Sequence, residues 1–465
     1  MSAICNDLIV IGAGPAGASA AISAANAGLK VVLFDENEAA GGQVYREPVW
    51  GRASEAGPEV AAGDALRARL AASGVDCRFG HRVWFVERCF RVCAVGPEGP
   101  VDCSAPLLVV SSGAQERHRP IPGWTLPGVI GLAAATNLLK AQRILPGRRI
   151  LVAGSDPLLL LVAVTILKSG GTLAGLIDVN GRADWLRALP DLAVRPDLMV
   201  RGANWYLSLL RSRTLILHRH ALASIQGEAG VESATVAPLD GSATMAEIAC
   251  DSVCYGFGLM PATEITRLLG LAHHYDPGRG GWFPQTQPDG STDLPGLFIC
   301  GDGAGILGAA AASIQGTLAG LAAARMAGRS AAAPAGLARK ASRASRFGAA
   351  MTRLAEPPET LLASIAPDTI VCRCEGVRRV DIDAAIHGGA VTLNSLKSTT
   401  RCGMGPCGGR ICEDSAAALI AAATGRSRQS VGQGTARPPL RPVPLAAICG
   451  AFDYAALPIP EAAPQ

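Results

Sequence analysis

Short, uninterrupted apolar runs recur along the chain, and most of them end at glycine or another small residue. They are Leu8–Ile11, Val31–Phe34, Leu107–Val110, Ile150–Ala153 and Leu297–Ile299. Strands buried on both faces of a parallel sheet have this pattern, whereas strands with one solvated face alternate apolar and polar residues. Because helix-length segments separate most of the runs, the pattern predicts an α/β fold with parallel sheets.

A glycine-rich turn and an alanine-rich helix follow the first run, and the second run ends at Asp35. In this arrangement Gly12 permits the sharp turn, Gly14 lets the backbone approach a pyrophosphate, and Gly17 lets helix and strand pack closely. The helix N-terminus at Pro15–Ala16 offers free N–H groups to the phosphates. Asp35 can accept hydrogen bonds from ribose hydroxyls, so the stretch predicts a dinucleotide site. An ordinary strand–helix corner would leave Asp35 without a role.

Further candidate cofactor contacts lie elsewhere in the chain. Gly42 and Gln43 belong to a loop that could follow a flavin ribityl chain or form a plain surface turn. Val83 lies in a strand-like segment, and Gly113 ends another strand where the backbone can approach a cofactor. Asp302 ends a strand inside a glycine loop, where its carboxylate suits a ribityl hydroxyl.

A second strand, turn and helix begin at Arg148, but Asp156 stands where a second glycine would meet the pyrophosphate. Its carboxylate would repel phosphate, so NAD(P)H, another nucleotide and no ligand all stay open for this turn. The strand expected at Asp251–Gly258 is predicted to return the chain to the first domain.

Five cysteines form two groups near the C-terminus, separated by enough chain for two short helices. Thiolates presented from glycine loops suit zinc or an iron–sulfur cluster, and buried thiols are the remaining reading. A flavin domain in the same chain favours a one-electron carrier, so [2Fe–2S] is the leading prediction. The predicted ligands are Cys372, Cys374, Cys407 and Cys412, and Cys402 is the alternative to either of the last two.

Charge and cysteine content narrow the function classes. The formal net charge is only +4, and no dense Lys/Arg run with interleaved aromatic residues occurs, so we expect no nucleic-acid partner. Fourteen cysteines without a recognisable leader favour reduced thiols and metal ligation, and they predict a cytoplasmic protein. The stretch from Gly303 to Ala324 is predicted as loop and helix rather than a membrane span.

The predicted organisation is a dinucleotide-binding domain in two parts around a second such domain, then a linker, a cysteine module and a tail. The expected limits are 1–118 and 251–330 for the first domain, 119–250 for the inserted domain, 331–366 for the helix and linker, 367–426 for the [2Fe–2S] module and 427–465 for the proline-rich tail.

Residues 8–326 resemble the flavoprotein disulfide reductase superfamily, whose members have two dinucleotide domains. The cysteine module resembles the ferredoxin-like domain of bacterioferritin-associated ferredoxin and of bacterial glycerol-3-phosphate dehydrogenases. The whole chain resembles one group, the FAD- and [2Fe–2S]-containing α subunits of opine oxidases, hydrogen cyanide synthase and D-hydroxyproline or proline dehydrogenases. That resemblance rests on the joint presence of Gly41-Gly42-Gln43, Pro122-Gly123-Trp124-Thr125-Leu126-Pro127-Gly128-Val129 and Cys402-Gly403-Met404-Gly405-Pro406-Cys407.

The resemblance implies a heteromeric FAD-dependent dehydrogenase of the cytoplasm or the inner membrane face. There a separate flavoprotein β subunit of amino-acid-oxidase type oxidises a C–N bond, and a downstream electron acceptor and a small third subunit complete the set. This chain would relay electrons from FAD to its cluster, and no side chain stands out as a general acid or base. The implied FAD contacts are Gly12, Gly14, Asp35, Gln43, Gly113 and Asp302.

Two alternative functions belong to other classes of protein. One is a self-sufficient NAD(P)H-dependent flavin and iron–sulfur reductase, which would need a working second nucleotide site. The other is a non-catalytic flavin-bearing or zinc-stabilised scaffold. Asp156 departs from the nicotinamide-binding pattern, and the central region lacks the Cys-x-x-Cys pair that a disulfide reductase uses as its dithiol.

Overall fold

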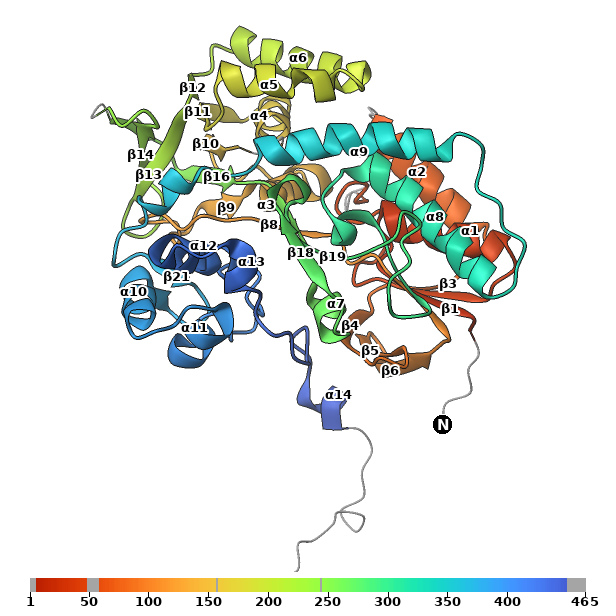
Figure 1. The fold of residues 1–465 in the computed structure, drawn as a ribbon. Coiled ribbons are helices and arrows are strands. Elements are labelled where there is room, and N and C mark those ends of the chain that lie inside the picture. Colours follow the sequence, from red (N-terminus) through yellow and green to blue (C-terminus); the bar gives the residue numbers. More distant parts are fainter. Residues whose placement is uncertain (1–5, 48–57, 156–157, 243–244, 450–465) are drawn as a thin grey trace, which may run out of the picture.

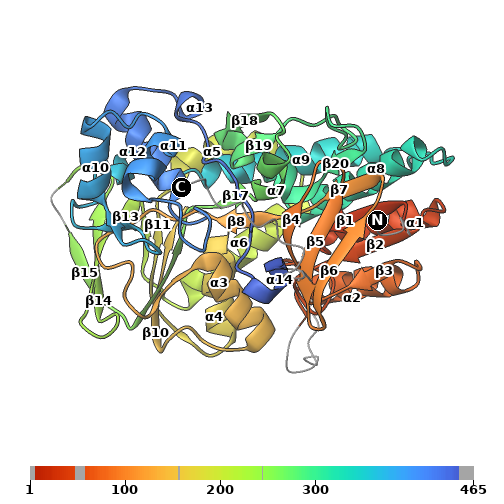
Figure 2. The same cartoon turned by 90° about the horizontal axis from the view of Figure 1, so that it is seen from below.

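The computed structural model describes residues 6–47, 58–155, 158–242 and 245–449 of the 465-residue chain. Two five-stranded parallel sheets form the body, and a small helical module that carries five cysteines packs beside them (Figure 1). The α/β fold with parallel sheets is therefore confirmed. Seen from below, the module lies next to the second sheet and far from the N-terminus (Figure 2).

The first sheet contains the glycine turn. Its strands in spatial order are β20 (Leu297–Ile299), β7 (Leu107–Val110), β1 (Leu8–Ile11), β2 (Val31–Phe34) and β3 (Asp76–Arg78), all parallel. One face is covered by α1 (Pro15–Asn26), α2 (Pro58–Ala71) and α8 (Ala309–Met326). The other face is covered by an antiparallel sheet of β4 (Arg82–Val86), β5 (Arg91–Gly96) and β6 (Gly99–Ser104).

The unbroken apolar run of β1 follows from this layering. Leu8 and Val10 pack among the helices, whereas Ile9 and Ile11 pack toward the antiparallel sheet. Successive side chains of a strand point to opposite faces, so a strand covered on both sides has no position for a polar residue.

The second sheet has the same layered plan. Its parallel strands in order are β12 (Ile216–His218), β11 (Thr172–Asp178), β10 (Arg149–Gly154), β16 (Ser252–Gly256) and β9 (Val129–Gly131). One face carries α3 (Leu132–Asn137), the π-helical stretch Leu138–Gln142, α4 (Leu158–Lys168) and α6 (Pro196–Arg211), with α5 (Arg182–Leu192) beside them. The opposite face carries β13 (His220–Gln226), β14 (Ser233–Pro238) and β15 (Ala246–Ala249).

The expectation that Asp251–Gly258 returns the chain to the first domain is wrong. Strand β16 pairs in parallel with β10 and β9, inside the second sheet. The chain re-enters the first unit just afterwards, where β17 (Leu259–Pro261) pairs with β8 (Ala114–Glu116). An apolar run does not say which sheet accepts it, because both parallel sheets offer the same kind of buried position.

The remaining elements connect the sheets and build the module. The connecting elements are α7 (Glu264–Leu268), β18 (His273–Asp276), the 3-10 turn Pro277–Arg279, β19 (Gly281–Pro284), the 3-10 turn Gly301–Ala304 and α9 (Leu337–Leu354). The module and its flanks comprise the 3-10 turn Glu359–Leu362, β21 (Ile370–Cys372), β22 (Val377–Arg378), α10 (Arg379–His387), α11 (Leu393–Thr400), α12 (Glu413–Thr424), α13 (Arg428–Val431) and α14 (Leu445–Cys449). The module has its own apolar core, and α10 and α11 are the two helices expected between its cysteine groups.

After α13 the chain crosses back to the first unit as an extended segment, residues 432–441, which we call the strap. The N–H of Leu440 donates to the carbonyl of Trp84 in β4 at 2.8 Å, and the Leu440 side chain joins the core beneath that strand. The Leu440 carbonyl accepts a hydrogen bond from Arg410 at 3.0 Å. The strap therefore packs on the chain's own body.

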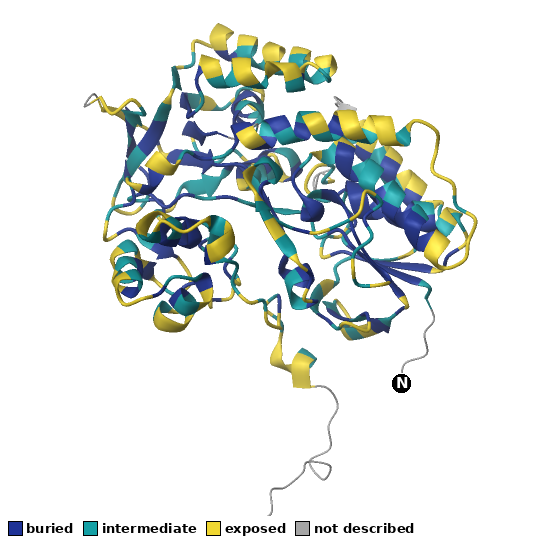
Figure 3. Ribbon diagram, in the orientation of Figure 1, coloured by how far each residue is buried: buried dark blue, intermediate teal, exposed yellow. Residues whose placement is uncertain are grey.

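The outer faces of α5, α6 and α9 are exposed, whereas the inner strands of both parallel sheets, such as β1 and β16, are buried (Figure 3). In the ranges that the structure describes, no helix combines the length and the apolar character needed to cross a membrane.

Asp156, which the sequence places in the second turn, lies outside the described residues.

The close packing of α1 and α8 generates a stability prediction. A Cβ at Gly320 would overlap the carbonyl oxygen of Ala20, whereas a Cβ at Gly202, inside α6, would meet open space. We expect Gly320→Ala to cost roughly 1–3 kcal/mol through overpacking and Gly202→Ala to gain about 0.5–1 kcal/mol. Thermal unfolding of the two variants measures the difference, and equal Tm values would contradict the tight helix contact.

Candidate functional site

The glycine turn after β1 has two glycines that the protein's own packing requires. Gly12 adopts a φ of +99°, and a Cβ on it would overlap the carbonyl oxygen of Ser111 at the end of β7. A Cβ on Gly17 would overlap the carbonyl oxygen of Gly12. Both residues let α1 begin directly against the carboxyl ends of β1 and β7.

Gly14 has no such requirement. It is the N-cap of α1 and has an ordinary φ of −65°, and a Cβ there would meet only the Cα of Gly42, at 3.9 Å. A Cβ on Gly113 would also meet open space, although its φ of +74° itself favours glycine. The start of α1 at Pro15 and Ala16, the Gly42 loop and the end of β7 thus surround a cradle that a side chain on Gly14 would begin to fill. Such a cradle fits a pyrophosphate at a helix N-terminus.

Asp302 faces the same region from the 3-10 turn after β20. Its carboxylate interacts with the backbone N–H groups of Leu307 and Gly308, yet its buried Oδ1 has no hydrogen-bond partner within the described chain. Burial raises the pKa of this carboxyl. A buried oxygen without a partner is costly, so Oδ1 fits a hydroxyl donor such as that of a ribityl chain. Gly301 and Gly303 bring the turn against Ala16 and Ser112.

The other predicted contacts are placed as follows. Asp35, directly after β2, accepts a hydrogen bond from the N–H of Ala13 at 2.5 Å and two from Asn37 at 2.7 Å, which orient its carboxylate beside the glycine turn. Gln43 is exposed next to Gly42, and Val83 packs from β4 toward the core under the sheet. Their contacts with a cofactor stay predictions.

Three of the five cysteines of the module form one buried group. The sulfurs of Cys372, Cys402 and Cys412 all lie within 4.8 Å of one another. The pKa of Cys372 is lowered to about 2, because the thiols of Cys402 and Cys412 donate to its sulfur and the N–H groups of Gly403 and Glu375 add to this. The structure therefore gathers three thiols around one point, with Cys372 as the acceptor of the other two.

The other two cysteines form a second, more accessible pair. The side chains of Cys374 and Cys407 hydrogen-bond to each other, and Cys374 is exposed. Gly405 packs so closely on Cys374 that a Cβ there would overlap it. The structure thus divides the predicted ligands between two groups, Cys372 and Cys412 with Cys402 in one and Cys374 with Cys407 in the other, and which of them bind a metal stays a prediction.

A buried ion cluster joins the module to the first unit. Arg119 and Arg428 bind the two oxygens of Asp414 at 2.5 and 2.6 Å. Arg117, only 2% exposed, lies 3.6 Å from Asp414 and pairs with Glu356 at 2.5 Å. Burial alone would raise the pKa of Asp414, but Arg428, Arg119 and Arg117 hold it well below the usual range. Asp414 is the second residue of α12 and comes two residues after Cys412.

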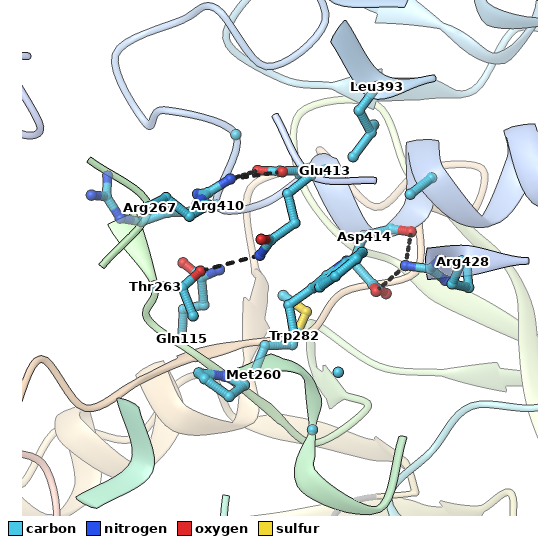
Figure 4. A pocket seen from close by; sticks show the side chains of 16 residues that line it. Gln115, Met260, Thr263, Arg267, Trp282, Leu393, Arg410, Glu413, Asp414 and Arg428 are labelled. Carbon is cyan, nitrogen blue, oxygen red and sulfur yellow. Dashed lines mark hydrogen bonds and ion pairs between the residues drawn. The ribbon is translucent and has the colours of Figure 1, made fainter. Parts of the chain in front are cut away.

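Further contacts surround this cluster. Arg267 of α7 binds Glu413 at 2.9 Å, and Arg410 binds Glu264 at 2.5 Å. Figure 4 shows the small cavity between the two parts, with Glu413 facing Arg267 and Asp414 facing Arg428. On the other side of the module the indole N–H of Trp124 donates to the carbonyl of Ile370 at 2.7 Å.

The carboxyl edge of the second sheet is covered by the chain itself. Ser155, after β10, donates through Oγ to the carbonyl of Ala355 at 2.7 Å, and Asn180, after β11, donates to the carbonyl of Leu354 at 3.0 Å. Ligands of open α/β sheets bind at this edge. The buried end of α9 therefore lies against the carboxyl ends of β10 and β11.

Residues 6–329 match the sequence model of the family described as pyridine nucleotide-disulphide oxidoreductase. The chain belongs to that family. Residues 367–451 match the sarcosine oxidase A3 domain. The predicted resemblance and the predicted fold class are thus confirmed, and the protein is an FAD-dependent oxidoreductase.

Relatives match over nearly the whole chain. An opine oxidase subunit of Agrobacterium tumefaciens (strain Ach5) is 34% identical, over 95% of this chain and 90% of its own length. Hydrogen cyanide synthase subunit HcnB of Pseudomonas aeruginosa is 31% identical, over 94% and 97%. Among solved structures, L-proline dehydrogenase from P. horikoshii matches with a TM-score of 0.71 at 19% identity, covering 95% of this chain and 79% of that one, which shows a likeness of fold.

Three cysteines of this oxidoreductase outside the module lie in its core. Cys250, Cys254 and Cys300 are buried, and burial raises their pKa values to about 11, 12 and 12. A thiol with such a pKa is protonated at neutral pH and is a weak nucleophile. These three cysteines thus fit packing rather than disulfide exchange.

Several site residues were not anticipated from the sequence. Arg117 and Arg119 follow β8 in a polar stretch that looks solvated, and Asp414 looks like an ordinary acidic residue in a first helical turn. The available signal was the pair Glu413-Asp414 at the head of an otherwise apolar helix, directly after a candidate ligand.

The cradle predicts a selective effect of Gly14→Ala. The backbone tolerates alanine there, since the new Cβ would touch only Gly42 at 3.9 Å. A methyl group in the path of the pyrophosphate should weaken FAD binding by about tenfold or more, roughly 1.4 kcal/mol. Flavin absorbance per chain after purification measures this, with Gly202→Ala as the control. Full flavin content in Gly14→Ala would remove Gly14 from the site.

The ion cluster predicts a large effect of Asp414→Asn, because the variant leaves buried arginines without their counter-charge. The expected cost is roughly 3–5 kcal/mol, against at most about 1 kcal/mol for Asp381→Asn, whose partner Arg378 is exposed. Since the folded-state pKa of Asp414 lies below the unfolded one, its stabilisation is present above about pH 4 and lost only in stronger acid. Hydrogen exchange in α12 and thermal unfolding at about pH 5–8 measure both variants. Equal behaviour would show that the cluster does not hold the module.

Proposed function

We propose that this oxidoreductase is the electron-transfer subunit of a heteromeric dehydrogenase, with FAD in the first sheet and a [2Fe–2S] cluster in the cysteine module. The observation that carries the proposal is the buried ion cluster, which fixes the cysteine module directly against the strand that leaves the flavin cradle. A metal module held for its own stability would need no buried contact with the flavin domain.

A short connection leads from one candidate site to the other. Gly113 at the cradle is followed by β8, and Arg117 and Arg119 come soon after that strand. Arg119 binds Asp414, and Cys412 precedes Asp414 by two residues. One short strand, one ion pair and the first turn of α12 thus link the flavin cradle to a candidate cluster ligand.

The division of the cysteines favours a cluster over zinc. A structural zinc ion takes four ligands at one point, whereas here three thiols gather at one place and two at another. Each iron of a [2Fe–2S] cluster takes two thiolates, so two groups suit two irons. N–H groups of Gly403 and Glu375 directed at Cys372 would also tune such a centre.

The chain's own residues bind and position the cofactors. Gly14 and Gly42 leave space for the pyrophosphate, Asp35 and Asp302 present carboxylates for ribose and ribityl hydroxyls, and the module holds its thiols at a fixed place. FAD, when bound, takes up two electrons and can release them singly to a one-electron carrier. No side chain described at the junction is placed as an acid or base for organic chemistry.

The names of the relatives support the substrate class and the assembly. The opine oxidase and hydrogen cyanide synthase relatives are both subunits by name. We infer that this chain works with a flavoprotein β subunit of amino-acid-oxidase type, which oxidises a C–N bond of an amino acid, imino acid or opine. We infer that a downstream electron acceptor and a small third subunit complete the assembly.

The alternative of a self-sufficient NAD(P)H-dependent reductase has less support. Ala355 accepts its hydrogen bond from Ser155 at the very turn where the nucleotide pyrophosphate would bind. A nucleotide would have to displace the end of α9, which is anchored by the ion pairs of Arg346 and Arg353 with Asp191.

Anaerobic purification of the chain with metal analysis tests the proposal. We expect bound flavin, about two irons per chain and a rhombic EPR signal after dithionite, and we expect NADH to leave the flavin oxidised. Stoichiometric zinc without an EPR signal would overturn the electron-transfer role. Rapid bleaching by NADH would favour the self-sufficient reductase.

A further inference from the structure

The cysteine module has one thiol more than a [2Fe–2S] cluster needs, and the position of the surplus thiol is informative. Four thiolates complete such a cluster, and five cysteines converge here. The inference that follows rests on the proposed function, because it concerns which of the five bind iron.

The outer pair accounts for one iron. Cys374 and Cys407 contact each other and no third cysteine sulfur is grouped with them in the described module. Strand β21 supplies Cys372 to the inner group and the turn that follows supplies Cys374 to the outer pair, so one short segment reaches both irons.

The inner group offers a choice for the other iron. Metal–sulfur bonds of about 2.3 Å put two thiolates on one metal at most about 4.6 Å apart. Cys402 and Cys412 both lie within 4.8 Å of Cys372 and of each other, and all three are buried. Either one can therefore share a metal with Cys372 after a small adjustment.

The two candidates are carried by different elements. Cys402 follows Arg401, whose left-handed conformation ends α11, and its N–H is held by Thr400 at 3.2 Å. Cys412 is the N-cap of α12, whose first two residues bind the flavin domain. A movement of one element therefore need not move the other ligand.

We propose that the inner iron is bound by Cys372 together with either Cys402 or Cys412, so that these two cysteines are interchangeable ligands. In the exchange one iron–sulfur bond breaks as another forms, and the proton of the incoming thiol passes to the outgoing thiolate. No electron is gained or lost. With both thiols beside Cys372, the inner iron keeps two thiolates whichever of Cys402 and Cys412 binds it.

Three variants of the full chain test this: Cys402→Ala, Cys412→Ala and the double variant. Alanine is chosen because a serine oxygen could itself bind iron. Cys89→Ala, at an exposed cysteine of the first unit, is the control for thiol loss, and Cys374→Ala is the control for loss of an outer ligand. The readouts are iron and acid-labile sulfide per chain and the EPR g-values of the dithionite-reduced protein.

We expect each single variant to keep close to the wild-type iron content and the double variant to lose at least half of it. At least one single variant should show shifted g-values, since its inner iron changes ligand. Loss of the cluster in Cys402→Ala or in Cys412→Ala alone would overturn the inference, and so would an intact cluster in the double variant. Wild-type protein without iron would instead overturn the proposed function, so the two failures are distinguishable. Far-ultraviolet circular dichroism separates either result from misfolding.

Discussion

The structure depends on one buried electrostatic arrangement, the arginines gathered around Asp414. An arginine such as Arg117, almost fully removed from water, is tolerated only where counter-charges meet it. One counter-charge belongs to the linker and the other to the cysteine module. The buried arginine charges of the flavin domain are therefore neutralised only when both segments are in place. Because Asp414 lies in the turn that also carries Cys412, the residue that satisfies the charge also sets the position of a candidate ligand.

The two parallel sheets share one layered architecture but differ at their carboxyl edges. In the first sheet the glycine turn opens on a cradle, and the buried Oδ1 of Asp302 has no hydrogen-bond partner among the described residues. In the second sheet Ser155 and Asn180 donate to carbonyls at the end of α9. The two sheets are covered by equivalent layers, but the polar groups at their carboxyl edges have different hydrogen-bond partners.

Local patterns sufficed for most of the elements, and they predict a first site. Buried strands are recognisable by unbroken apolar runs, and the glycine spacing with Asp35 marks a dinucleotide turn. Sequence patterns could not predict which residues and strands pair when they lie far apart in the chain. Arg119 and Asp414 are almost three hundred positions apart, β16 can join either of two similar sheets, and Ala355 covers Ser155 only because of the way the chain folds. The choice between Cys402 and Cys412 was open for the same reason, since spacing alone gives no distance between sulfurs.

The strap has a consequence for how electrons would move. The cysteine module is held at its beginning by the linker after α9 and at its end by the strap, where Leu440 is fastened to Trp84 and Arg410. Together with the ion cluster around Asp414, these attachments hold the module against the first unit. Electron transfer between flavin and cluster would then be tunnelling over a constant distance, with a rate that does not depend on solvent viscosity. Any partner that accepts the electron would have to dock at the module itself.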